Sequence, residues 1–158
     1  MNKSATTEPM TSPFAHGLRG YYLEDLHEGM STAYAKTLTE ADVVIFAGIT
    51  GDNNPMHINE EFATETMFKG RIVHGMLTSS LISTVIGTRL PGPGCIYLDQ
   101  QLKFTAPVAI GDTVTATATV LEIIPERRRV IMKTVCTVQG KVVVDGVATI
   151  KVDSREKK

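Results

Sequence analysis

The segment IVHGMLTSSLISTVIGT, residues 72–88, decides the fold of this chain, because it contains no Asp, Glu, Lys or Arg. Large apolar residues and small Ser, Thr and Gly residues occur around the whole circumference of the helix that this segment would form. A helix of that kind is normally buried on all sides. It is too short and too rich in hydroxyl groups for a membrane span, which needs roughly 20 mostly apolar residues. We therefore expect a buried central helix.

The chain after this helix has the pattern of β-strands. The sequence LPGPG, residues 90–94, ends the helix because it contains two prolines and two glycines. Apolar and polar residues then alternate in successive segments, which predicts strands at about residues 95–106, 114–120, 129–138 and 142–152. One more strand is expected before the helix, at residues 30–38. Together these elements predict an α+β fold in which an antiparallel sheet wraps around the long central helix.

The composition is that of an ordinary globular protein with a sizeable core. The chain has 158 residues, 42% of them hydrophobic and 21% charged, which predicts a single domain. Its formal net charge of −1 gives no broad basic surface for nucleic acid or an anionic membrane. The two cysteines, Cys95 and Cys136, lie far apart in strand-like segments, so we expect buried, reduced thiols. The N-terminal segment has no continuous apolar region typical of a secretory signal, and we expect a cytoplasmic protein.

Three regions follow from this composition. Residues 1–20 are rich in Ser, Thr, Pro and Gly, which is typical of a flexible lead-in. Residues 21–153 form the expected folded domain, and residues 154–158 form a short charged tail.

The segment GDNNPMH, residues 51–57, is an unusual link between two predicted helices. Thr39 followed by Asp42 is a helix-capping pattern, and Gly51 is suited to end that helix. Asn59 is a second candidate N-cap. The link between them places Asp52 and His57 on either side of a proline, and these are suitable acid and base groups.

GDNNPMH resembles the D-x-N-P-x-H motif of the MaoC-like (R)-specific enoyl-CoA hydratases. The segment GRIVHGML, residues 70–77, is similar to the start of that family's central helix, and PVAIGDTV, residues 107–114, to a turn in its sheet. The resemblance covers about residues 20–152 and implies a single hot dog fold. It also implies a homodimer, with an acyl-CoA thioester near the interface between the subunits.

The activity implied by the resemblance is the reversible syn addition of water to a trans-2-enoyl-CoA, giving the (R)-3-hydroxyacyl-CoA. Asp52 and His57 would be the catalytic pair, with the roles of acid and base left open. Gly75 would bind the thioester carbonyl through its N–H group at the start of the buried helix. Ser83 matches a family serine near the catalytic pair; it either braces the loop or bonds along its own helix. No metal or redox cofactor is needed, because coenzyme A is part of the substrate.

The positions of other residues in the sequence suggest further roles in the site. Asn54 can bond local backbone and brace the turn, and it is a further candidate contact of the substrate. Ser79, Ile82, Ser83 and Ile86 share the helix face below Gly75 and could form the floor of an acyl tunnel. Bulky Ile86 there predicts short acyl chains, of the length of crotonyl-CoA. For His74 we expect a structural role.

Two other functions compete with hydration. Hot dog thioesterases hydrolyse acyl-CoA and usually place an acid or base on or beside the central helix, where this chain offers only His74. A non-catalytic acyl-CoA-binding module is the other alternative, since a fold alone does not determine function. An intact Asp52–His57 pair argues against it.

Overall fold

The computed structural model describes residues 17–156. The prediction of a flexible lead-in therefore falls mostly on residues outside the described part, as do the last two residues of the charged tail. The strands are β1 (Ser31–Thr37), β2 (Ile96–Phe104), β3 (Thr113–Ile124), β4 (Arg129–Val138) and β5 (Lys141–Lys151). The helices are α1 (Glu40–Thr50), α2 (Pro55–Ile58), α3 (Glu60–Glu65) and α4 (Gly75–Thr88), with short 3-10 turns η1 (Leu23–Asp25) and η2 (Pro125–Arg127).

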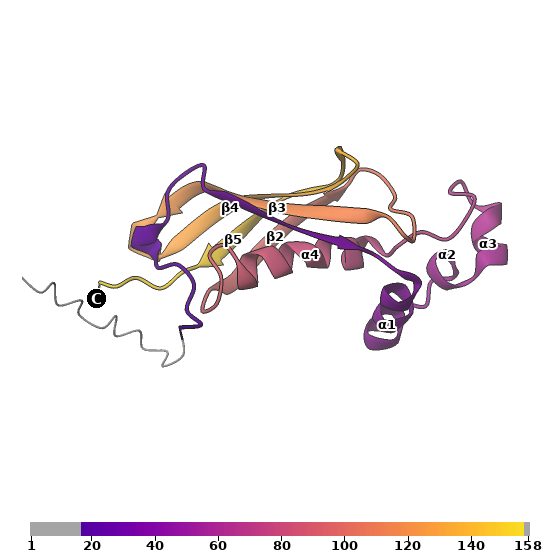
Figure 1. The fold of residues 1–158 in the computed structure, drawn as a ribbon, viewed down its shortest axis with the longest axis horizontal. Helices are drawn as coiled ribbons and strands as arrows, with labels where there is room; N and C mark the ends of the chain where they lie inside the picture. Colours follow the sequence, from indigo (N-terminus) through magenta and orange to yellow (C-terminus); the bar gives the residue numbers. More distant parts are fainter. Residues whose placement is uncertain (1–16, 157–158) are drawn as a thin grey trace, which may run out of the picture.

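The five strands form one sheet in the order β1-β3-β4-β5-β2, and every neighbouring pair is antiparallel. The helix α4 runs along one face of this sheet, as Figure 1 shows, and it contacts β1, β3 and β4. The α+β arrangement predicted from the sequence is confirmed. The strand β2 lies at an edge of the sheet.

The core lies between α4 and the sheet. The buried α4 side chains are Thr78, Ser79, Leu81, Ile82, Val85 and Ile86. They face strand residues such as Val114, Val120, Val130, Met132 and Ile150, which belong to the same apolar cluster. The opposite side of α4 differs from expectation, because Ser80 and Ser83 are exposed and Met76 is 57% exposed. The helix was expected to be buried on all sides, but in a single chain the sheet covers it from one side only.

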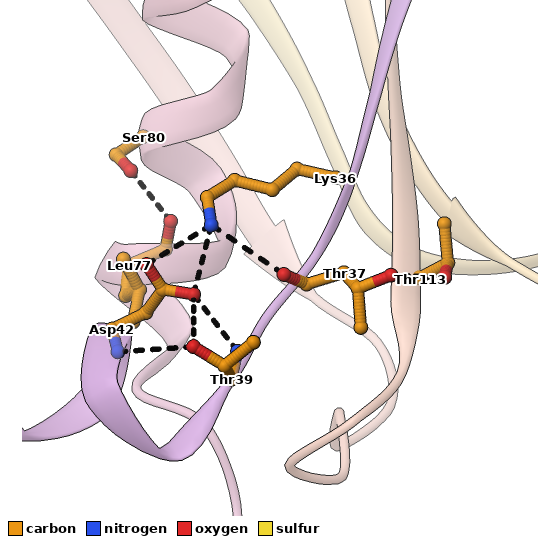
Figure 2. A network of polar contacts seen from close by, with 7 residues as sticks. All are labelled: Lys36, Thr37, Thr39, Asp42, Leu77, Ser80 and Thr113. Atoms are coloured by element: carbon orange, nitrogen blue, oxygen red, sulfur yellow. Dashed lines mark hydrogen bonds and ion pairs between the residues drawn. The ribbon is translucent and has the colours of Figure 1, made fainter.

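A polar network joins the end of β1 to the start of α1 (Figure 2). Thr39 is the N-cap of α1, and its hydroxyl accepts the Asp42 N–H, while Asp42 Oδ2 accepts the Thr39 N–H at 2.8 Å. Lys36 Nζ from β1 donates to both carboxylate oxygens of Asp42, at 3.0 and 2.8 Å. The capping box predicted from the sequence is confirmed, and it fixes the direction in which α1 leaves the sheet.

The helices α1, α2 and α3 lie together beyond one end of the sheet (Figure 1). Arg71 holds this group together, since its guanidinium bonds Glu40 of α1 at 2.7 and 2.8 Å and Glu60 of α3 at 2.9 Å. These three charged side chains lie at the protein surface, so the contacts set geometry more than they add stability.

Two further expectations concern cysteines and membranes. Cys95 and Cys136 are free thiols; Cys136 is buried, as predicted, whereas Cys95 is only half-buried. Burial raises the pKa of the Cys136 thiol to about 12, so this group is unreactive. Among the described residues, every helix is too short or too polar to cross a membrane.

Candidate active site

The loop between α1 and α2 positions Asp52. Gly51 ends α1 in the left-handed conformation, with φ of 78°, as its glycine predicted. Asn54 caps the next helix, because its side-chain oxygen accepts the Met56 N–H at 3.1 Å. Asp52 lies between them with an exposed side chain, and its Oδ1 accepts the Asn54 N–H at 3.3 Å. The bracing role expected for Asn54 is thus observed, while its contact with substrate stays a prediction.

His57 lies in a short helix and not in an open link. The sequence predicted that residues 52–57 connect two helices, but Pro55 begins α2, which includes His57. The physical reason is that a proline at the first helical position has the φ of a helix already fixed, and Asn54 supplies the cap. As a result His57 points inward and is only 8% exposed.

The tautomer of a neutral His57 ring follows from its hydrogen-bond partner. Its Nδ1 lies 2.7 Å from the carbonyl oxygen of Ile72. A carbonyl can only accept, so Nδ1 carries the hydrogen and the neutral ring keeps its lone pair on Nε2. The Nε2 atom is therefore able to accept a proton from a water.

His74 joins this pair in a compact cluster. Its Nε2 donates to the backbone carbonyl oxygen of Asp52 at 3.0 Å. Its ring lies against the ring of His57, with centroids 3.9 Å apart, and near Phe46, at 4.9 Å. One nitrogen of each histidine and one carboxylate oxygen of Asp52 all lie within 4.8 Å of one another. These are residue types that also bind metal ions, but a single water can bridge groups up to about 5 Å apart with ordinary hydrogen bonds.

Gly75 is the first residue of α4, as the sequence predicted. The N–H groups of a first helical turn have no partner within the helix and attract negative charge. A Cβ at this position would lie 2.9 Å from two ring atoms of Phe104, the last residue of β2. Any side chain at this position therefore requires the Phe104 ring to shift.

A cavity of about 500 Å³ adjoins this cluster. Its lining comes from the loop after α1, the segment between α3 and α4, the start of α4, the end of β2 with the segment after it, and β5: Asp52, Phe68, Ile72, Val73, His74, Gly75, Met76, Thr78, Phe104, Thr105, Ala106, Pro107, Val108 and Val144. The cavity brings together Asp52 and Gly75 from the predicted site, mostly among apolar groups. His57 lies outside this lining and reaches the cavity through its neighbours Asp52 and His74.

Ser83 and Ile86 lie away from the cavity. The lining includes α4 only as far as Thr78, whereas Ser83 and Ile86 lie about 12 and 16 Å along the helix from Gly75 at the usual helical rise. Ser83 is exposed on the uncovered side of α4, and Ile86 is fully buried against the sheet. Their roles in bracing the loop and setting chain length stay predictions that the cavity of the single chain does not support.

Two residues of the site were not predicted as functional. His74 was expected to be structural, and the clue to a larger role was its position directly before Gly75. In the sequence, Phe104 is simply an apolar residue at the end of a strand. Its contact with Gly75, 29 positions away, is made by the tertiary fold, and no local pattern indicates it.

Comparison with known proteins gives consistent results. A family model described as MaoC like domain matches residues 24–145. The chain is 56% identical over 135 residues to an (R)-specific enoyl-CoA hydratase from Rhodospirillum rubrum, covering 85% of this chain and 94% of that relative. It is 51% identical over 139 residues to a 3-hydroxybutyryl-CoA dehydratase from Methylorubrum extorquens, covering 88% of each.

The chain is also similar to solved structures of R-hydratases. The unliganded R-hydratase PhaJ1 from Pseudomonas aeruginosa matches with a TM-score of 0.81 at 44% identity, over 86% of this chain and 88% of that one. The (R)-hydratase from A. caviae involved in PHA biosynthesis matches with a TM-score of 0.79 at 38% identity, over 82% and 98%. The likeness to both structures confirms the hot dog fold expected from the resemblance.

Proposed function

This chain belongs to the MaoC-like domain family, and we propose that it is an (R)-specific enoyl-CoA hydratase that works through Asp52 and His57. It adds water to a trans-2-enoyl-CoA and catalyses the reverse dehydration, as a hydro-lyase. The observation that carries the assignment of residues is that Asp52, which lines the cavity together with the N-terminus of α4, lies in one compact cluster with His57.

Hydration of a conjugated thioester needs a water activated for attack on C3 and a proton delivered to C2. The Asp52 carboxylate and the His57 Nε2 hold this water between them. The new C3–O bond forms as the water loses a proton to the pair, and the pair returns one proton to C2. Because both groups share the same water, they act as one unit, and neither has a separate assignment as acid or base.

The third requirement is stabilisation of the enolate oxygen that develops as water adds. The Gly75 N–H supplies this at the N-terminus of α4, where the helix dipole favours negative charge. The apolar lining of the cavity strengthens such a bond by excluding water.

The acyl group of the substrate is short, of crotonyl length. The support is the name of the relative from M. extorquens, a 3-hydroxybutyryl-CoA dehydratase. Coenzyme A is part of the substrate, and the chemistry uses only protein groups and water. Incubation with EDTA followed by gel filtration should leave kcat unchanged within error. A loss of activity that Zn²⁺ or Mg²⁺ restores would contradict this.

The enzyme is a homodimer. Seven of the nine residues of edge strand β2 are exposed, and they include Ile96, Leu98 and Phe104. An exposed apolar edge strand needs a cover, and a second copy can pair its own β2 with this edge about a two-fold axis. We place the enzyme in the cytoplasm, where its free thiols remain reduced.

The test of function is direct. Purified protein is mixed with crotonyl-CoA, the loss of the enoyl-thioester absorbance is followed, and the product is analysed on a chiral column. We expect (R)-3-hydroxybutyryl-CoA without release of free thiol. Thiol release from butyryl-CoA would instead indicate a thioesterase, and binding without turnover of crotonyl-CoA or octenoyl-CoA would indicate a binding module.

A further inference from the structure

The imidazole of His74 contacts several parts of the candidate site at once. Its Nε2–H bonds the backbone oxygen of Asp52 at 3.0 Å, across 22 positions of the chain. The centroids of its ring and of the His57 ring are 3.9 Å apart, and His74 is the residue directly before Gly75. Asn54 also bonds both residues, since its N–H donates to Asp52 Oδ1 and its carbonyl accepts the His57 N–H, but it lies between them in the same loop. His74 contacts both from a distant segment of the chain.

We propose that His74 is a positioning residue of the hydratase, whose Nε2–H holds the Asp52 loop beside the His57 ring in the geometry that binds the reacting water. This inference rests on the proposed function, because it gives His74 a role only through Asp52 and His57. It replaces the purely structural role expected from the sequence.

The chemistry of the side chain favours this role over simple packing. His74 is 1% exposed, and within the described residues its Nδ1 is buried without a hydrogen-bond partner. Burial of an unpaired polar atom is unfavourable, so a phenylalanine would fill the same space better if packing were the only requirement. We therefore infer that the function of the imidazole is the hydrogen bond from its Nε2–H to the backbone oxygen of Asp52.

Helix capping does not explain the imidazole either. His74 occupies the N-cap position of α4, but its side chain makes no capping hydrogen bond. The side chain instead turns toward the loop that contains Asp52. A carbonyl anchored in this way limits the movement of the Asp52 side chain, and a shift of about 1 Å at a reacting group can lower a rate about 100-fold.

Two substitutions separate the donor from the ring. His74→Phe keeps an aromatic ring of similar size and removes the N–H donor. His74→Gln removes the ring but carries an amide N–H at the same number of bonds from the backbone as Nε2. With crotonyl-CoA we expect His74→Phe to lower kcat about 10- to 100-fold, and His74→Gln to stay within about threefold of wild type, since the hydrogen bond is kept.

A double-mutant cycle distinguishes positioning from loss of structure. If His74 acts through Asp52, then His74→Phe lowers the rate of an Asp52→Asn enzyme by no more than about twofold. If His74 only supports folding, the two losses multiply. Ile150→Val in the distant core is the control, because it lowers Tm while kcat stays at the wild-type value.

The outcomes are distinct. The inference is supported by three results together. Wild type hydrates crotonyl-CoA, His74→Phe lowers kcat while His74→Gln does not, and the losses from His74→Phe and Asp52→Asn do not multiply. Full activity of His74→Phe, or losses that multiply with Asp52→Asn, overturns the inference and leaves the proposed function standing. A wild type that neither hydrates crotonyl-CoA nor octenoyl-CoA overturns the proposed function, and the inference with it.

Discussion

Glycine at position 75 shows how one absent side chain sets the geometry of the site. Gly75 lines the cavity at the start of α4, and the ring of Phe104 packs where a Cβ would be. Phe104 is nonetheless 52% exposed, so its ring covers Gly75 without being held on every side. If the thioester oxygen binds at Gly75, as we propose, the substrate passes beside this ring.

Gly75→Ala tests this arrangement. The new methyl group forces the Phe104 ring to move, and we expect kcat/KM for crotonyl-CoA to fall about 10- to 100-fold. Phe104→Leu serves as the matched control, and the double variant separates the two effects. If the double variant recovers, the clash with the ring is the cause; if a single Gly75→Ala enzyme is fully active, close approach to this glycine is not required.

At the scale of the elements, the start of α1 is held by one carboxylate. Asp42 accepts hydrogen bonds from Lys36 and from the N–H and hydroxyl of Thr39 (Figure 2). The Lys36 ammonium foremost, and then the two Thr39 donors, lower the pKa of Asp42 to about 2. Because the carboxylate has a lower pKa in the folded than in the unfolded protein, it stabilises the fold at pH values above the usual Asp pKa. This stabilisation is lost as the pH falls from the usual Asp pKa toward 2.

We predict that Asp42→Asn lowers the free energy of unfolding at pH 7 by about 1 kcal/mol, the usual contribution of a helix cap. Between about pH 4 and pH 2 the difference from wild type should shrink, because the wild-type carboxylate becomes protonated there. Urea unfolding at several pH values measures both effects. Glu122→Gln, which alters an exposed carboxylate on β3, is the control and should show neither.

The elements also show what the sequence could predict. The absence of charge over residues 72–88 predicted α4 correctly, and the caps at Thr39, Gly51 and Asn59 were placed correctly, because these signals are local. The short helix that includes His57 was missed, since proline can indicate either a link or a helix start. The contact of Phe104 with Gly75 and that of His74 with Asp52 depend on how distant segments meet, which no local pattern encodes.

At the scale of the whole molecule, one side of the fold is left uncovered. The side of α4 turned away from the sheet exposes Met76, and the adjoining helix α1 exposes Val44, Ile45 and Ile49. With the apolar residues of edge strand β2, these make several exposed apolar side chains, more than the single ones that are normal on a protein surface. A second subunit bound on this side would cover the face of α4 that the single chain leaves exposed.

Leu98→Lys tests the dimer. Leu98 lies on β2 and is 45% exposed, so a lysine there is harmless to a monomer but opposes pairing of two edges. Light scattering should give twice the mass of the chain for wild type and a shift toward the monomer for Leu98→Lys. Leu121→Lys is the matched control at 46% exposure on β3, and it should remain dimeric. A monomeric wild type would contradict the proposal.

The measurement that tests the central claim most directly is the rate of crotonyl-CoA hydration by Asp52→Asn, His57→Gln and the double variant, each checked for wild-type circular dichroism. We predict that each single substitution lowers kcat by at least about 10²–10⁴-fold, the range of general acid–base groups. The double variant should be hardly slower than the slower single variant, because both residues act on one water. Near-normal turnover in either single variant would show that the water is activated elsewhere.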